Sequence, residues 1–396
     1  MDRLFSSAMR STSLIALVLA IGMGCTNNPP PDVVDGGGGD DGGSGDTGGP
    51  SGPDAGVDAH FNYVPHDAGY DDAGPAAAFT APMETWTGIT IEGSHCGNGS
   101  PMVVAVNLTN QSTDVVVYFQ GGGACWDGGT CFGLHTATHI EDTLTAASVV
   151  AEAMTASETP FVLHRDDTGN PYRTASYVYI PYCTGDGHSG TTVTTLSYNG
   201  TDHQVHFEGA RNSELVLERT LATVPTTTHV TLVGASGGGY GVLGNWWRAQ
   251  AIFASARVDA LSDSGLPLDV PAARWTVMQN AWGIDLPPGC DGCDSLGDAL
   301  PFYARTMPLP HRFGLLAYID DTVISMFYAE SSVHAGLVAL EAPMNATTNQ
   351  RYFYVNDHGH VVLGDDSQEA GTSGVSARQW VTQFATDDAA WASVGP

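Results

Sequence analysis

The sequence has 396 residues and a formal net charge of −30 at pH 7, and 42% of its residues are hydrophobic. All 13 basic residues are arginines, so a polyphosphate would meet a repulsive field, and we expect no nucleic-acid partner. The apolar share is large enough for a sizeable core, which excludes a wholly disordered chain.

An apolar run from Leu14 to Gly24 follows two arginines near the N-terminus. It is too short to span a bilayer, which takes about 20 helical residues, so it predicts a signal peptide over residues 1–24. Cys25 follows small residues as in a bacterial lipobox, although Gly22 stands where a branched apolar residue is usual. We expect acylation of Cys25, with ordinary cleavage nearby as the alternative. The protein would be exported, either as a bacterial outer-membrane or cell-surface lipoprotein or as an extracellular protein, with a lipid anchor as its only membrane contact.

The stretch that follows Cys25 contains mainly Gly, Asp and Pro. Such a composition cannot bury enough apolar surface to offset the entropy lost on ordering. We therefore interpret residues 25–77 as the anchor cysteine and a disordered tether, and residues 78–396 as the folded domain.

Residues 78–396 alternate short β-branched runs with longer helical patterns. This rhythm is typical of an α/β fold with a mostly parallel central sheet and helices on both faces. The predicted strands are Val115–Phe119, Tyr177–Ile180, His229–Val233, Val258–Leu261, Phe313–Ile319 and Arg351–Val355. The predicted helices are Ala210–Ala222, Tyr240–Phe253, Ala272–Ala281 and Ser376–Phe384.

Three glycines, Gly121, Gly122 and Gly123, directly follow the first of these strands and Gln120. Glycines at such a position let backbone N–H groups approach a ligand closely, as in the oxyanion loop of lipases. A phosphate-binding loop is the alternative, but no Gly-Lys-Ser/Thr follows.

Six cysteines remain beyond Cys25, an even number in a chain that we expect to be exported, so three disulfides are predicted. The close pairs Cys125/Cys131 and Cys290/Cys293 suggest local bridges, which would leave Cys96 to pair with Cys183. A zinc site is the alternative at Cys290/Cys293, but no second Cys or His pair accompanies it. We expect no metal and no cofactor.

Ser236 lies in the stretch Gly-Ala-Ser-Gly-Gly, between the predicted strand His229–Val233 and the helix Tyr240–Phe253. Strand, tight glycine turn and helix are the context of the nucleophile elbow of α/β-hydrolases. The alternative is a glycine-rich turn with an incidental serine. The context favours Ser236 as a catalytic nucleophile, with the N–H of Gly237 as one donor to the oxyanion.

A serine nucleophile needs a base and an acid, which in α/β-hydrolases follow it in the order acid, then histidine. One strand ends in Asp320-Asp321, and a later strand leads into a loop that contains His358 and His360. We take His360 as the base and keep His358 as the alternative. Asp263, which follows another strand, is a rival acid, although residues at that position more often line the pocket.

Several motifs together resemble the pectin acetylesterases and Notum-type carboxylesterases, an α/β-hydrolase family, over roughly residues 83 to 365. They are Val-Val-Tyr-Phe-Gln-Gly-Gly-Gly-Ala-Cys-Trp at 116–126, Gly-Asn-Pro-Tyr at 169–172, Tyr-Ile-Pro-Tyr-Cys at 179–183, Phe-Glu-Gly-Ala-Arg at 207–211 and Gly-Ala-Ser-Gly-Gly at 234–238.

The resemblance implies a Ser236, Asp320 and His360 triad and an oxyanion hole of Gly122, Gly123 and Gly237. It also matches Cys125 with Cys131 and Cys96 with Cys183. Two departures stand beside Ser236: the chain has Gly123-Ala124 where relatives have Trp after the glycines, and Gly237 where many have Ala.

The sequence thus predicts a secreted serine esterase that hydrolyses short-chain carboxylic esters, acetyl esters first among them, through an acyl-enzyme on Ser236. An acetylated polysaccharide is the substrate class that the resemblance implies, and a neutral polyester or lipid ester is an alternative that suits the acidic chain. A non-catalytic glycan-binding lipoprotein is the second hypothesis, since Trp126, Trp246 and Trp247 could stack on sugars. We expect a monomer.

Overall fold

A computed structural model of the chain describes residues 76–155, 160–364, 371 and 373–395. The predicted signal peptide, Cys25 and nearly all of the predicted tether lie outside the described residues. Within the described residues, no helix is both long and apolar enough to cross a membrane.

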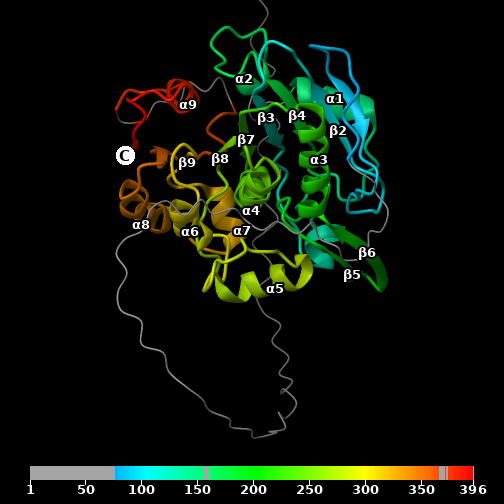
Figure 1. Cartoon of the computed structure of the whole chain (residues 1–396). Coiled ribbons are helices and arrows are strands. Elements are labelled where there is room, and N and C mark those ends of the chain that lie inside the picture. The colour runs from blue at the N-terminus through cyan, green and yellow to red at the C-terminus, as the bar shows by residue number, and fades with distance from the viewer. Residues whose placement is uncertain (1–75, 156–159, 365–370, 372, 396) are drawn as a thin grey trace, which may run out of the picture. The chain divides into compact units, whose positions relative to one another are not determined.

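The described residues form an eight-stranded sheet with the order β1-β2-β4-β3-β7-β8-β9-β10 (Figure 1). Strands β1 and β2, and β2 and β4, pair antiparallel, and all other pairs are parallel. The α/β fold and its mostly parallel sheet are therefore confirmed. The strands are β1 Thr87–Thr90, β2 Val103–Asn107, β3 Val115–Phe119, β4 Ser176–Ile180, β7 His229–Ala235, β8 Arg257–Asp263, β9 Phe313–Tyr318 and β10 Gln350–Val355.

Every residue of β3 and β4 is buried, as expected of strands that are covered on both faces. This continuous burial explains why short runs of Val, Tyr and Ile identified the central strands in the sequence. Because the parallel strands point the same way, the turns after β3, β7, β8, β9 and β10 all lie at one edge of the sheet.

Helix α4 (Gly237–Ile252) packs against β7 and β8, and α3 (Gly209–Thr223) packs beside α4. Twelve of the 16 residues of α4 are buried, which accounts for a helix without a polar face. Trp246 and Trp247 lie in this buried set, so they belong to the core and not to a sugar-binding surface. The other helices are α1 Ala146–Thr155, α2 Pro160–Leu163, α5 Ala272–Trp282, α6 Ala299–Thr306, α7 Thr322–Tyr328, α8 His334–Asn345 and α9 Ala377–Ala385, with a π-helical turn at Gly129–Gly133.

A two-stranded hairpin, β5 (Thr192–Tyr198) with β6 (Thr201–Phe207), forms a second sheet beside α5 (Figure 1). The hydroxyls of Thr192 and Thr194 both donate to the carbonyl of Ala281 at the end of α5. The hairpin therefore supports one end of this helix.

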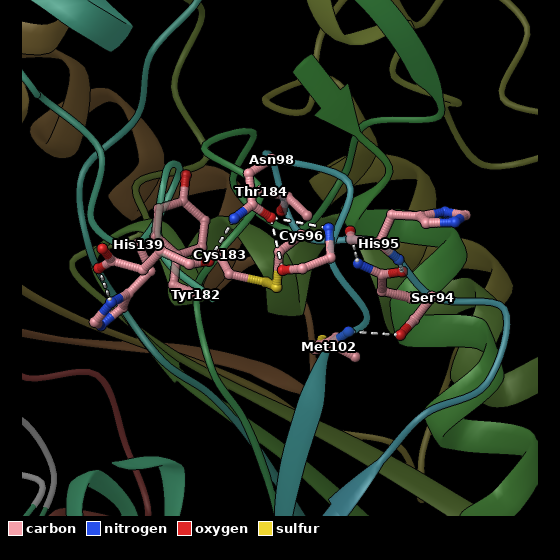
Figure 2. Close-up of a disulfide and its surroundings, with 12 residues drawn as sticks. Ser94, His95, Cys96, Asn98, Met102, His139, Tyr182, Cys183 and Thr184 are labelled. Atoms are coloured by element: carbon pink, nitrogen blue, oxygen red, sulfur yellow. Dashed lines mark hydrogen bonds and ion pairs between the residues drawn. A yellow bond between two sulfur atoms is a disulfide. The ribbon is translucent and has the colours of Figure 1, made fainter. Parts of the chain in front are cut away.

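All three predicted disulfides are present: Cys96 with Cys183, Cys125 with Cys131, and Cys290 with Cys293. Figure 2 shows the first of them, which joins the loop after β1 to the loop after β4. This bridge links segments 87 residues apart in the sequence. The zinc alternative at Cys290 and Cys293 does not agree with the structure, in which the two sulfurs are bonded to each other.

Candidate active site

Ser236 occupies the sharp turn between β7 and α4, with φ 53° and ψ −121°. A positive φ at a residue with a Cβ stores strain of roughly 1–3 kcal/mol, which the surrounding structure must offset. The turn is held by the N–H of Ser236, which donates to the carbonyl of Asp263 at 2.7 Å. A Cβ on Gly234 would collide with the carbonyl of Gly238, and one on Gly238 with the carbonyl of Phe119, so only glycines allow this turn.

His360 lies in the loop after β10 and joins two side chains from distant parts of the sequence. Its Nε2 is 2.8 Å from the Oγ of Ser236, and its Nδ1 is 2.7 Å from Oδ2 of Asp321. The Asp321 side chain is fully buried, while the His360 side chain is 19% exposed. The structure therefore forms an unbroken hydrogen-bonded chain from a buried carboxylate to the serine hydroxyl.

The carboxylate that contacts His360 belongs to Asp321, so the expectation that Asp320 contacts His360 was wrong by one residue. The Asp320 side chain points to the surface, where its Oδ1 is 3.0 Å from Nδ1 of His334. Strand β9 ends at Tyr318, and Asp321 is the N-cap of α7. Its Oδ1 accepts from the backbone N–H groups of Val323 and Ile324, which leaves Oδ2 directed at His360.

His358, the alternative base, is exposed, and within the described residues it makes hydrogen bonds through its backbone N–H and carbonyl. The structure thus brings His360, and not His358, to Ser236.

Asp263, the rival acid, is fully buried but holds the loop that follows His360. Its Oδ1 accepts from the N–H of Val362 at 2.9 Å, and its Oδ2 accepts from the N–H of Leu363 at 2.8 Å. The neighbouring Ser264 hydroxyl accepts from the N–H of Val361, whose φ is 66°. Burial raises the pKa of the Asp263 carboxyl to about 6, although these N–H groups favour its charged form.

The glycine loop after β3 lies against the turn at Ser236. A Cβ on Gly237 would stand 2.9 Å from the carbonyl oxygen of Gly123 and 3.7 Å from the amide nitrogen of Gly122. The loop is fixed because the N–H of Ala124 donates to Thr136 and the carbonyl of Gly122 accepts from Thr138. Gly122, Gly123 and Gly237 are therefore brought together beside Ser236, as the resemblance implied.

A pocket of about 670 Å³, part of it open to solvent, begins at Ser236. Its walls are mainly apolar and aromatic, as is usual for small-molecule sites. Helix α5 contributes Trp275, Met278 and Trp282, and α7 contributes Ile324, Phe327 and Tyr328.

Ala124 and Asp186 also line this pocket. Ala124 directly follows the three glycines. Burial raises the pKa of the Asp186 carboxyl to about 6, and the carboxyl accepts hydrogen bonds from Thr184 and from the N–H of Gly209. Trp126 is buried against Trp282 and Phe327, two residues that line the pocket. Its ring is therefore not exposed for stacking on a sugar.

The family model of the pectinacetylesterases matches residues 76–282, which is just over half of the chain. The chain belongs to the pectinacetylesterase family. It is accordingly a carboxylic ester hydrolase, with the α/β fold that the sequence predicted.

The solved structures include a similar fold in the Wnt deacylase Notum from Drosophila. The TM-score is 0.58 at 19% sequence identity, and the alignment covers 78% of this chain and 96% of the Notum chain. No curated protein shows a significant match.

Among the described residues, one group of side chains could hold a metal ion, and it is made of His95, His206 and Glu208. None of the three is among the residues that line the pocket at Ser236. Sequence reasoning missed this group because its members are not spaced as a metal motif. It also missed Asp321, for which the signal was present: an Asp directly before the helical run Thr-Val-Ile-Ser is a typical N-cap.

Proposed function

We propose that this carboxylic ester hydrolase is a serine esterase in which Ser236 is the nucleophile, His360 the base and Asp321 the residue that orients it. The observation that supports this best is the hydrogen-bonded chain of 2.8 Å and 2.7 Å that runs from Ser236 through His360 to Asp321. A strained serine at the end of a strand and a glycine loop beside it fit the same role.

In the proposed reaction, the Oγ of Ser236 attacks the ester carbonyl carbon while Nε2 of His360 takes the hydroxyl proton. The N–H of Gly237, at the start of α4, and those of Gly122 and Gly123 stabilise the oxyanion. His360 then returns its proton to the departing alcohol, which leaves an acyl-serine. A water molecule, deprotonated by His360, releases the carboxylic acid and restores Ser236.

The apolar pocket supports an acyl group longer than acetyl, because its lining extends from Ser236 to the side chains of α5 and α7. The small Ala124 keeps this wall open. We therefore favour apolar acyl esters over the acetyl esters that we expected from the sequence, and acetylated polysaccharide becomes the second candidate substrate. Two of the three aromatics suggested for sugar stacking are core residues and the third is buried, which weakens the glycan-binder alternative.

Export and a lipid anchor at Cys25 stay part of the proposal. Three disulfides support an oxidising compartment, because such bridges persist outside the cytosol.

The test is to assay the protein on p-nitrophenyl acetate, butyrate, hexanoate and octanoate beside Ser236→Ala. We expect kcat/KM to rise from acetate to the longer esters, and the variant to lose activity on all of them while it keeps the thermal melting point within a few degrees. Equal rates for wild type and variant would refute the serine mechanism. A preference for acetate would refute the inference of a longer acyl group from the pocket, but not the serine mechanism.

A further inference from the structure

Two histidines and one glutamate converge away from the pocket, at the N-terminus of α3. Nδ1 of His95 lies 3.0 Å from Oε2 of Glu208, and Nδ1 of His206 lies 2.7 Å from the same oxygen. The two imidazole rings are 4.9 Å apart between centroids. We propose that His95, His206 and Glu208 form a binding site for a divalent transition-metal ion, namely zinc.

His95 is held in place from both sides. Its backbone N–H donates to Oδ1 of Asn212, and its carbonyl accepts from Nδ2 of the same side chain. The next residue is Cys96, whose disulfide to Cys183 fixes the loop (Figure 2). The position of the first ligand is therefore set before any ion binds.

His206 and Glu208 are fixed just as firmly. His206 lies in β6, and its N–H donates to the carbonyl of Gly97 in the loop that carries His95. Glu208 directly precedes α3, and only 4% of its side chain is exposed. A nearly buried carboxylate thus faces two imidazole nitrogens, and all three groups are held in place. This preorganisation lowers the conformational entropy that the ligands lose when an ion binds.

The donor set selects the type of ion. Two imidazoles and one carboxylate suit zinc and its first-row neighbours, whereas calcium and magnesium prefer all-oxygen sites. Zinc binds imidazole nitrogen and carboxylate oxygen at about 2.0–2.2 Å, so its ligand atoms stand roughly 3.4 Å apart in a tetrahedral site. The distances of 3.0 Å and 2.7 Å from the two Nδ1 atoms to Oε2 of Glu208 have to lengthen only slightly for an ion to replace the protons of these hydrogen bonds.

Both histidine side chains are partly exposed, at 30% for His95 and 19% for His206. A fourth coordination position would therefore face solvent and take a water molecule. The ion would join β6 to the loop after β1, and the same hairpin supports α5 through Thr192 and Thr194. Zinc would thus stiffen the frame that carries one wall of the pocket.

The experiment is a calorimetric zinc titration of the tag-free, metal-free protein at neutral pH, with cobalt as a spectroscopic probe. We expect one ion per chain and a higher melting point with zinc. His95→Ala, His206→Ala and Glu208→Gln should each weaken binding by roughly 100-fold or more, because loss of a ligand costs more than loss of the groups around it. Visible cobalt bands of a four-coordinate site should disappear in the same variants.

The matched control is His203→Ala, on the same strand, which should bind zinc like the wild type. Ser236→Ala should also bind normally, so this site and the proposed esterase mechanism can fail separately. Absence of stoichiometric binding, or equal affinity in the wild type and the folded ligand variants, would overturn the proposal and leave the cluster as a hydrogen-bonded one.

Discussion

Replacing Asp321 by Asn tests which of two adjacent carboxylates acts on His360. An Asn at this position can still accept from the N–H groups of Val323 and Ile324, so the start of α7 should persist. Its NH₂ group would face Nδ1 of His360 and force the proton onto Nε2, which could then no longer accept from Ser236.

The expected loss of kcat follows from the distance between the Asp321 carboxylate and the His360 ring. A carboxylate and an imidazolium 2.7 Å apart attract each other by about 6 kcal/mol at an effective dielectric constant near 20. At 1.36 kcal/mol for each tenfold change in rate, loss of this attraction lowers kcat by roughly 10⁴-fold. The assay is kcat on p-nitrophenyl butyrate, measured beside thermal unfolding.

The matched control is Asp320→Asn, one residue away. Its carboxylate pairs with His334 at the surface, where an ion pair contributes only about 0–1 kcal/mol to stability, so kcat should stay within about twofold of the wild type. The reasoning is refuted if Asp321→Asn retains kcat within tenfold, or if Asp320→Asn loses as much as Asp321→Asn.

Three further predictions concern the pocket, the loop after His360 and the response to acid. Ala124→Trp should fill the pocket wall and lower kcat/KM for p-nitrophenyl octanoate roughly tenfold more than for acetate, and an unchanged ratio would contradict this. Asp263→Asn replaces one acceptor of the Val362 and Leu363 N–H groups with a donor, so kcat should fall roughly 100-fold as His360 shifts; unchanged kinetics would show that Asp263 does not position the base. Burial lowers the pKa of His188 to about 4, so the fold keeps it neutral while the unfolded chain gains a proton below pH 6.5. Its contribution to the free energy of unfolding should therefore fall by about 3 kcal/mol between pH 6.5 and pH 4, measured as the difference from His188→Asn in urea titrations; a constant difference would contradict it.

The central strands were predictable because each is a short, continuous apolar run, and β3 begins and ends where the sequence indicated. The β5 and β6 hairpin was missed because its residues are mostly polar and alternate between exposed and half-buried positions, which gives no apolar run. Its local signal was the Asn199-Gly200 turn between the two strands, where both residues have positive φ, and we did not use it.

The proposed nucleophile, Ser236, and the proposed base, His360, could be singled out in the sequence because glycines and strand ends mark them. The carboxylate that contacts His360 could not be chosen from the sequence, since Asp320 and Asp321 differ only in which way each side chain points after β9. That direction depends on the exact end of the strand and on the helix cap, and a one-residue difference reverses it.

The double role of Asp321 ties two properties of the protein together. One of its oxygens begins α7 and the other orients His360, while Ile324, Phe327 and Tyr328 of the same short helix face the acyl pocket. A change that shifts α7 to accept a different acyl group also moves the acid. Under the proposed mechanism, acyl specificity can therefore diverge through Ala124 and α5, whereas α7 is constrained by its contact with His360. We expect natural variation in acyl preference to accumulate at Ala124 and α5.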